Sequence, residues 1–231
     1  IDFQVFDFQK EYKQNVVDYM IREYQAGRTP NPDVMCNQEV KFKLFLEAAM
    51  AAGAEYIATG HYARTSEGRL LQTYFLYRVT SEALAKTMFP LGDFTKAEVR
   101  QMAKERGLWT ASKKESMGIC FVGQVGIREF LSEYVETSPG DIIDQQTGVV
   151  VGRHDGAIFY TLGQRHGLAL GGGLPYYVIG KDMAKNEVYV SRSIDNANLW
   201  RKELTLTDVH WIGQPPKDGT YQVRVRHRAP L

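Results

Sequence analysis

The sequence predicts an α/β domain followed by all-β segments, and two observations carry this prediction. In residues 1–137, apolar residues at helical spacing alternate with short apolar runs that are typical of strands. After Pro139, short β-type runs separated by Gly, Asp and Asn turns replace that pattern. Helix–strand alternation favours a parallel sheet with helices on its faces, whereas closely spaced short strands favour an all-β module. We expect domains at 1–137, 138–203 and 204–231.

Two helices are expected near the beginning of the chain. The first covers about residues 15–25, where Met20 and Tyr24 fall at helical spacing and Gly27 is a suitable residue to end it. The second covers about residues 34–52 and has one apolar side. A proline-rich loop separates them, and its rigidity becomes important below.

A short buried strand is expected at residues 56–59, ending in Gly60 and His61. A later strand ends at Leu71, and another apolar run begins at once with Gln72, without turn residues between them. Either one strand runs through this junction, or a segment is absent between the two residues. A glycine and a histidine at the end of a parallel strand lie where α/β folds bind ligands.

The next helix has clear signals at both ends. Thr95 and Glu98 have the spacing of a capping box, and Gly107 follows the last helical residue. A short amphipathic helix is expected at about 127–135. From about residue 202, a further β pattern ends after one hairpin's worth of sequence. Because an isolated hairpin is unstable, this pattern indicates the beginning of a C-terminal β-barrel.

The composition excludes several classes of protein. The 231 residues are 44% apolar and 12% aromatic, so the chain can build a substantial core. A formal net charge of +1 gives no global basic field, although local basic patches remain possible. There is no apolar run long enough to span a membrane and no secretory signal, and two cysteines in 231 residues favour a reducing cytoplasm.

The stretch GRTPNPDVMCN combines two prolines, an acid and a cysteine. If Asp33 caps the second helix, Cys36 is the third helical residue, in the first turn, where unpaired N–H groups favour a thiolate. The negative charge of Asp33 opposes that effect. A thiol and a carboxylate on one rigid turn can serve as nucleophile and general acid/base. A capped helix with a buried cysteine explains the same spacing.

Cys120, in ESMGICFVG, is the second cysteine. The preceding Gly118 would let a substrate or partner backbone approach, although a core cysteine fits the apolar run equally well. The two cysteines are 84 positions apart (120 − 36), so neither a C-x-x-C redox motif nor a zinc site is indicated, and no metal site is expected. The three glycines at 171–173 precede no helix and are interpreted as a loop.

The motifs taken together resemble the bacterial tRNA-specific 2-thiouridylases over nearly the whole chain. The matching stretches are, in order, GRTPNPDVMCNQEVKF, ATGHYAR, QTYFLYRV, KKESMGICFVG, PGDIID, HDGAIFYTLGQRHGL and YYVIGKD. The resemblance implies a Rossmann-like PP-loop ATP pyrophosphatase domain, an all-β central module and a C-terminal β-barrel. It also implies that ATP, with Mg²⁺, adenylates the C2 oxygen of the wobble uridine of a tRNA, and that sulfur then replaces this oxygen.

The resemblance also implies the catalytic residues. Cys120 would carry the incoming sulfur as a persulfide, delivered by an upstream donor protein. Cys36 would be the partner nucleophile that helps to release the sulfur and ends in a disulfide with Cys120. Asp33 would be the acid/base, and Asn31, Pro32 and Asp33 would contact the target base.

The same resemblance assigns binding residues outside the cysteine motifs. Gly60 would contact ATP, and His61 would contact the tRNA. Gln72 matches the end of a tRNA-contacting Lys-Asp-Gln motif whose first two residues are missing here. Arg226 and His227 match a basic pair that touches tRNA in the terminal barrel.

One departure from the family pattern affects the expected activity. The Ser-Gly-Gly-x-Asp-Ser loop that cradles ATP phosphates would lie before Ile1, so adenylation is expected of the intact protein. Three readings remain open: the sulfur-transfer enzyme, a catalytically incomplete tRNA-binding fragment of it, and a related ATP pyrophosphatase that uses ammonia or an amine. The two cysteine motifs argue against the third, because amide or guanidino synthesis needs no cysteine pair.

Overall fold

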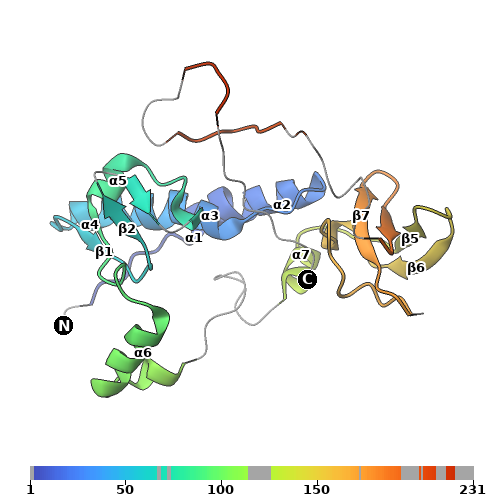
Figure 1. Cartoon of the computed structure of the whole chain (residues 1–231). Helices are drawn as coiled ribbons and strands as arrows, with labels where there is room; N and C mark the ends of the chain where they lie inside the picture. Colours follow the sequence, from blue (N-terminus) through green and yellow to red (C-terminus); the bar gives the residue numbers. More distant parts are fainter. Residues whose placement is uncertain are drawn as a thin grey trace. The chain divides into compact units, whose positions relative to one another are not determined.

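The computed structural model describes residues 3–66, 69–71, 74–113, 126–171, 173–193, 203, 205–211 and 217–221 (Figure 1). The chain divides into two compact units, each formed by segments that are separate in sequence. The first unit comprises Ile1–Tyr19, Asn31–Gln124 and Val209–Pro216. The second comprises Met20–Pro30, Val125–Asp208 and Lys217–Leu231.

The first long helix begins six residues earlier than expected. It runs without a break through α1 (Gln9–Tyr12), the π-helical segment η1 (Lys13–Val17) and α2 (Asp18–Gln25). The expected end is confirmed, because Gly27 has a φ of 77°. The amide of Arg28 donates to the Glu23 carbonyl and that of Gly27 to the Tyr24 carbonyl, both at 2.9 Å, which completes a Schellman motif.

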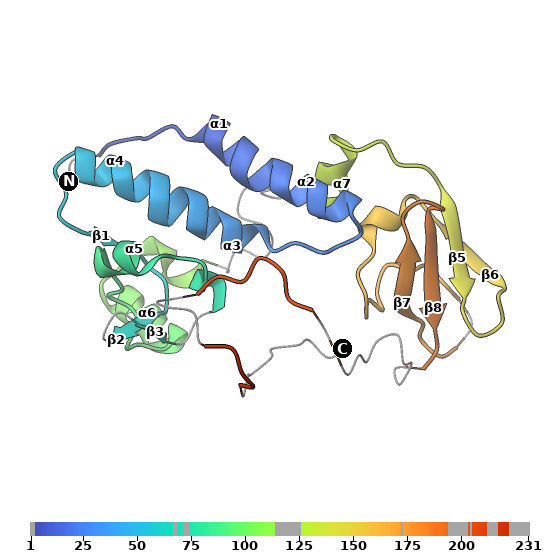
Figure 2. The same cartoon turned by 90° about the horizontal axis from the view of Figure 1, so that it is seen from above.

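The second long helix comprises α3 (Pro32–Cys36), the π-helical segment η2 (Asn37–Leu44) and α4 (Phe45–Ala51). It runs antiparallel to the first helix, with η1 packed against α3 and α1 against η2 (Figure 2). Gly53, with a φ of 94°, ends it in the same way as Gly27 ends the first helix.

The expected capping residue of this second helix is wrong. Asn31 is the residue that precedes the first turn, with extended φ and ψ of −113° and 92°, and Pro32 is the first helical residue. A proline favours the first helical position and forces the residue before it into an extended conformation, so Asn31 must lie outside the helix. Asp33 is therefore the second helical residue, and Cys36 lies in the second turn.

A small parallel sheet follows the helices. Strand β1 (Ile57–Ala58) pairs in parallel with β4 (Thr87–Met88), and β2 (Arg64–Ser66) forms an antiparallel hairpin with β3 (Arg69–Leu71). Strand β1 lies within the expected range of 56–59. The core between this sheet and the helices consists of Phe42, Ala49, Ile57, Ala63, Leu76, Val79, Ala83 and Leu84.

The apolar run after Leu71 does not continue as a strand. It forms the 3₁₀ helix η3 (Tyr74–Leu76) and then α5 (Ser81–Ala85), which leads into β4. Thr80 caps α5 by accepting a hydrogen bond from the Ala83 amide at 3.2 Å, and this cap was not predicted. Residues 72 and 73, including Gln72, lie outside the described residues.

The predicted capping box is confirmed at the start of α6 (Lys96–Glu105). The Thr95 hydroxyl accepts from the Glu98 amide at 3.3 Å, and the Glu98 carboxylate accepts from the Thr95 amide at 2.7 Å. A 3₁₀ helix, η4 (Trp109–Ser112), follows α6.

The second unit contains α7 (Ile127–Ser132) and a four-stranded sheet in the order β6-β5-β8-β7. Its strands are β5 (Gly140–Asp144), β6 (Val150–His154), β7 (Tyr177–Asp182) and β8 (Glu187–Ser191), with the 3₁₀ helix η5 (Ala157–Phe159) after β6. The predicted β module is confirmed. Its core consists of Ile142, Ala157, Tyr160, Leu168, Tyr176, Val178, Val188 and Val190.

Much of the expected C-terminal barrel at 204–231 lies outside the described residues, and the described stretches 205–211 and 217–221 form no strand. The C-terminal barrel therefore stays a prediction. Among the residues that the structure describes, no helix is long and apolar enough to cross a membrane.

Candidate active site

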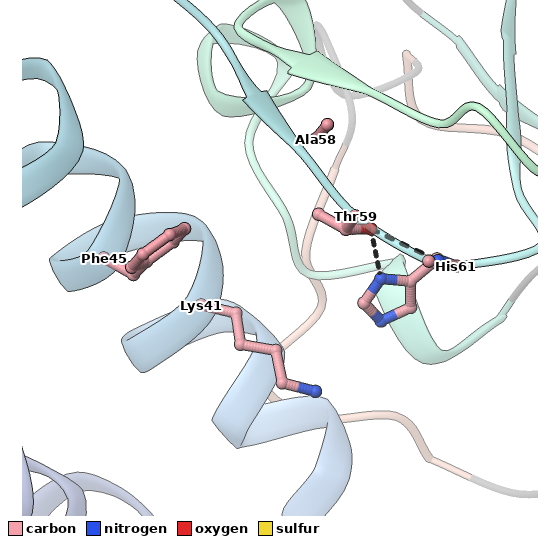
Figure 3. Close-up of a pocket in the computed structure, with 6 residues that line it drawn as sticks. Lys41, Phe45, Ala58, Thr59 and His61 are labelled. Atoms are coloured by element: carbon pink, nitrogen blue, oxygen red, sulfur yellow. Dashed lines mark hydrogen bonds between the residues drawn. The ribbon is translucent and has the colours of Figure 1, made fainter. Parts of the chain in front are cut away.

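A pocket of about 410 Å³ lies at the carboxyl end of the parallel strand β1, in the first unit (Figure 3). The second long helix forms one wall, and the chain directly after β1 forms the other. The lining residues are Lys41, Phe45, Ala58, Thr59, Gly60 and His61. Ligands of open α/β sheets bind at this position, so the strand-end location predicted for Gly60 and His61 holds a cavity of suitable size.

The imidazole of His61 is held in a fixed orientation beside this pocket. Its Nδ1 lies 2.6 Å from the Thr59 hydroxyl, which also accepts the His61 backbone N–H at 3.3 Å (Figure 3). The ring packs against Phe42 and Phe89, with centroid distances of 5.5 and 6.4 Å. Burial, together with the nearby positive charge of Lys41, lowers the pKa of His61, which favours the neutral ring.

Close backbone packing holds the loops after β1 and β4 together. A Cβ placed on Gly92 would lie 2.1 Å from the carbonyl oxygen of Ala63, a distance that no side chain tolerates. Arg64 reinforces this contact, because its Nε donates to the Gly92 carbonyl at 2.9 Å and pairs with Asp93 at 2.8 Å. Gly60 is different, since an added Cβ would meet Leu91 at 3.9 Å, an ordinary contact.

Lys41 and Phe45 were not selected by sequence reasoning, although both line the pocket. They lie four residues apart on η2 and α4, and Figure 3 shows both on the helix opposite the strand end. Their spacing of four is the signal that could have identified them, once the helix was known to face residues 58–61.

The turn that carries Cys36 matches the alternative of a helix start with a buried cysteine. Cys36 is 6% exposed and Val34 is 4% exposed, while Asp33 and Asn31 are partly accessible. The cause is the position of the helix start at Pro32, which places Cys36 in the second turn and directs it inwards. Asp33 remains in the first turn, where the helix dipole stabilises a carboxylate.

Asn37, next to Cys36, ties this helix to a distant segment. Its side chain is 3% exposed, and its Nδ2 donates to the backbone carbonyl of Phe75 at 3.1 Å. Its Oδ1 has no hydrogen-bond partner among the residues that the structure describes. Asn37 therefore links the cysteine turn to η3.

The structure brings some predicted site residues together and leaves others undescribed. Pro32, Asp33 and Cys36 lie in the first two turns of the second long helix, directly after Asn31, and the same helix also lines the pocket of Gly60 and His61. The remaining predicted site residues, which are Cys120, Gln72, Arg226 and His227, lie outside the described residues. An approach between Cys36 and Cys120 therefore stays a prediction.

Metal binding finds no support in the part of the chain that the structure describes. Its His, Cys, Asp and Glu residues form no group of three or more that could hold an ion.

Comparison with known proteins identifies the family. Residues 1–124, more than half of the chain, match the model of the tRNA methyl transferase HUP domain. The chain belongs to this family. Residues 128–192 match the tRNA methyl transferase PRC-barrel domain, so a HUP domain, which is Rossmann-like, precedes a PRC-barrel domain. The predicted order of an α/β domain and a β module is confirmed.

Two relatives of the family show the extent of the similarity. The tRNA-specific 2-thiouridylase MnmA of Bacillus cytotoxicus is 46% identical over 99% of this chain, which spans 65% of that relative's length. The tRNA-specific 2-thiouridylase MnmA 2 of Geobacillus kaustophilus is also 46% identical, over 100% of this chain and 66% of its own length. The predicted resemblance to tRNA-specific 2-thiouridylases is thus confirmed, and the chain spans slightly less than two thirds of these relatives.

Proposed function

We propose that the intact protein is a tRNA-uridine 2-sulfurtransferase that converts a wobble uridine of tRNA to 2-thiouridine. The observation that carries this proposal is the arrangement of the second long helix. Its first two turns hold Asp33 and Cys36, and its middle lines the strand-end pocket with Gly60. The names and the 46% identity of the relatives support the same activity.

In this proposal the start and the middle of the second long helix contact different substrates. ATP, with Mg²⁺, occupies the strand-end pocket, where Gly60 lets the nucleotide approach the backbone closely. Asn31, Pro32 and Asp33 contact the target uridine, and Asp33 acts as acid/base. The C2 oxygen of the base attacks the α-phosphate, and pyrophosphate leaves. This step is needed because a carbonyl oxygen leaves poorly and AMP leaves well.

The sulfur transfer balances without an external oxidant. The terminal sulfur of a persulfide on Cys120 attacks C2 of the adenylated base. The Cys36 thiolate then attacks the Cys120 Sγ and breaks the sulfur–sulfur bond, so that the electrons of that bond remain on the transferred sulfur. AMP leaves as the C2–sulfur double bond forms, and the two cysteines end as a disulfide. A separate reductant must restore both thiols before the next turnover.

The burial of Cys36 means that its thiol must be uncovered before it can react. We propose that tRNA binding repositions the segment carrying Cys120 and opens this turn. His61, Gln72, Arg226 and His227 contribute tRNA contacts, an upstream persulfide protein donates the sulfur, and the reaction takes place in the cytoplasm.

The test is in vitro thiolation of unmodified tRNA by the full-length protein, with ATP and a persulfide donor, followed by mass spectrometry of the nucleosides. Replacing Cys36 or Cys120 by Ser should abolish 2-thiouridine while ATP binding is retained, because each thiol acts in the sulfur transfer and not in the proposed nucleotide site. Full thiolation by Cys120→Ser would refute the mechanism.

A second candidate is a tRNA-binding protein without catalytic activity. The chain spans 65% of the Bacillus protein's length, which is consistent with this candidate. ATP binding by the full-length protein, measured by calorimetry, separates the two candidates. An absence of ATP binding combined with tight tRNA binding would support the second.

A further inference from the structure

The side chain of Lys41 lines the strand-end pocket, and the proposed reaction gives its ammonium group no role. The side chain is half-buried and extends from η2 towards the side of the pocket where His61 lies (Figure 3). A lysine can bury its aliphatic stem and keep its ammonium accessible. At the wall of a pocket such an ammonium is available to bind an anion.

The protein supplies no carboxylate for this charge within the part of the chain that the structure describes. The ion pairs found there include Lys43 with Glu39 at 3.0 Å, on the same π-helical segment, but none involves Lys41. No carboxylate is among the residues that line the pocket. Lys43 has an ion-pair partner on the surface, whereas Lys41 lines the cavity and has no ion pair among the described residues.

The neighbouring groups show that the pocket experiences this positive charge. Burial lowers the pKa of His61 and the ammonium of Lys41 adds to this effect, so His61 favours its neutral form and does not compete for an anion as a second cation. The Thr59 hydroxyl lies at the same end of the pocket. An ammonium beside neutral hydrogen-bonding groups is suited to a phosphate oxygen.

The position along the helix indicates which phosphate this is. Lys41 is eight residues after Asp33, a distance of about 12 Å at the rise of an α-helix. It lies beyond the turn proposed to hold the uridine and within the pocket proposed to hold ATP. The α-phosphate must lie between these two sites, because it is the atom group that the base attacks.

We propose that Lys41 binds the α-phosphate of the nucleotide in the strand-end pocket and stabilises the charge that develops on it during adenylation. This inference rests on the proposed function, since it requires that a nucleotide occupies the pocket. A phosphate of the RNA backbone offers the same chemistry. The nucleotide is favoured because the site is a concave pocket of about 410 Å³ that also contains Gly60.

The experiment compares the binding of AMP and adenosine to the full-length protein by calorimetry. Adenosine fills the base and sugar sites without a phosphate, so the ratio of the two affinities isolates the phosphate contact. Lys41→Met should weaken AMP binding by about 10- to 100-fold, the range for one charge-assisted hydrogen bond, and leave adenosine binding unchanged. Lys41→Arg should retain much of the preference for AMP.

Lys43→Met is the matched control, because it removes the same charge from the same helical segment but outside the pocket. It should leave both affinities within about twofold, and melting curves should show that all variants are folded. An unchanged AMP-to-adenosine ratio in Lys41→Met would overturn the role of Lys41 while the proposed function stands. Failure of the wild-type protein to bind any nucleotide would overturn the proposed function itself.

A third measurement tests whether Lys41 binds a phosphate of the RNA backbone instead of the nucleotide. The affinity for unmodified tRNA without nucleotide should be the same for wild type and Lys41→Met when it is measured at low and at moderate salt. A selective loss of tRNA affinity, with a smaller salt dependence and normal AMP binding, would assign Lys41 to the RNA backbone and overturn our proposal.

Discussion

Gly60 lies on the loop after β1 and Gly92 on the loop after β4. The structure nevertheless predicts opposite consequences when each is replaced by alanine. A methyl group on Gly92 would lie 2.1 Å from the Ala63 carbonyl oxygen and 3.0 Å from the Ala63 carbonyl carbon. Both are backbone atoms, which cannot rotate away. A methyl group on Gly60 would meet the end of the Leu91 side chain at 3.9 Å, which is ordinary van der Waals contact.

The expected magnitudes follow from these contacts. Overpacking of this kind costs about 1–3 kcal/mol, so Gly92→Ala should lower the free energy of unfolding by that amount. For a protein of this size, each kcal/mol corresponds to about 2–4 °C in melting temperature, which gives a decrease of about 2–12 °C. Gly60→Ala should change the free energy of unfolding by less than about 0.5 kcal/mol.

Nucleotide binding should be affected in the more stable of the two variants, Gly60→Ala. If ATP approaches the Gly60 backbone closely, the added methyl group of Gly60→Ala should weaken ATP binding by about tenfold or more, in a protein of normal stability. Calorimetry and thermal melting of the full-length variants provide both readouts. An equal loss of melting temperature in the two variants, or a Gly92→Ala protein as stable as wild type, would refute the reasoning from these distances.

Two further predictions concern titrating side chains. Burial and the charge of Lys41 lower the pKa of His61 in the folded protein, so the unfolded chain binds a proton at a higher pH than the folded one. The free energy of unfolding should therefore fall as the pH drops from the ordinary histidine pKa to the lower pKa of folded His61. NMR titration should show His61 below the ordinary histidine range, with a rise in Lys41→Met; a normal value in wild type would contradict this. Burial lowers the pKa of Lys181 to about 8 from 10.5, and its Nζ donates to the Tyr160 carbonyl at 2.7 Å. The free energy of unfolding should therefore rise between about pH 8 and pH 10.5, and melting curves of Lys181→Met that keep the same rise would count against this pKa.

Local signals in the sequence predicted the helix ends well. Gly27, Gly53 and Gly107 all have positive φ and follow helices, and the capping box of Thr95 and Glu98 forms as expected. These features depend on residues within one or two turns of each other, so the sequence contains all the information needed.

The start of the second helix was predicted wrongly, although the signal was present. Pro32 at the first helical position identifies Asn31 as the preceding residue, and Asp33 was chosen because aspartate is a common cap. The burial of Cys36 follows from that shift. In contrast, no local signal indicated the π-helical segment that follows Cys36, which packs against α1, α5 and η3.

The pocket could be predicted only in part. Gly60 and His61 were identified because they end a strand, which is a feature of the local sequence. Lys41 and Phe45 enter the same pocket from a helix that lies well before it in sequence. Their role depends on a long-range contact between two elements, and spacing on the helix alone did not indicate which face would meet the strand.

The central claim is that Cys36 and Cys120 act as one sulfur-exchange pair, and a single turnover tests it most directly. The full-length protein, loaded with one persulfide at Cys120, is mixed with ATP and tRNA in the absence of reductant. The nucleosides and the proteolytic peptides are then quantified by mass spectrometry. One Cys36–Cys120 disulfide should form for each 2-thiouridine. Formation of 2-thiouridine with both thiols still reduced would contradict it.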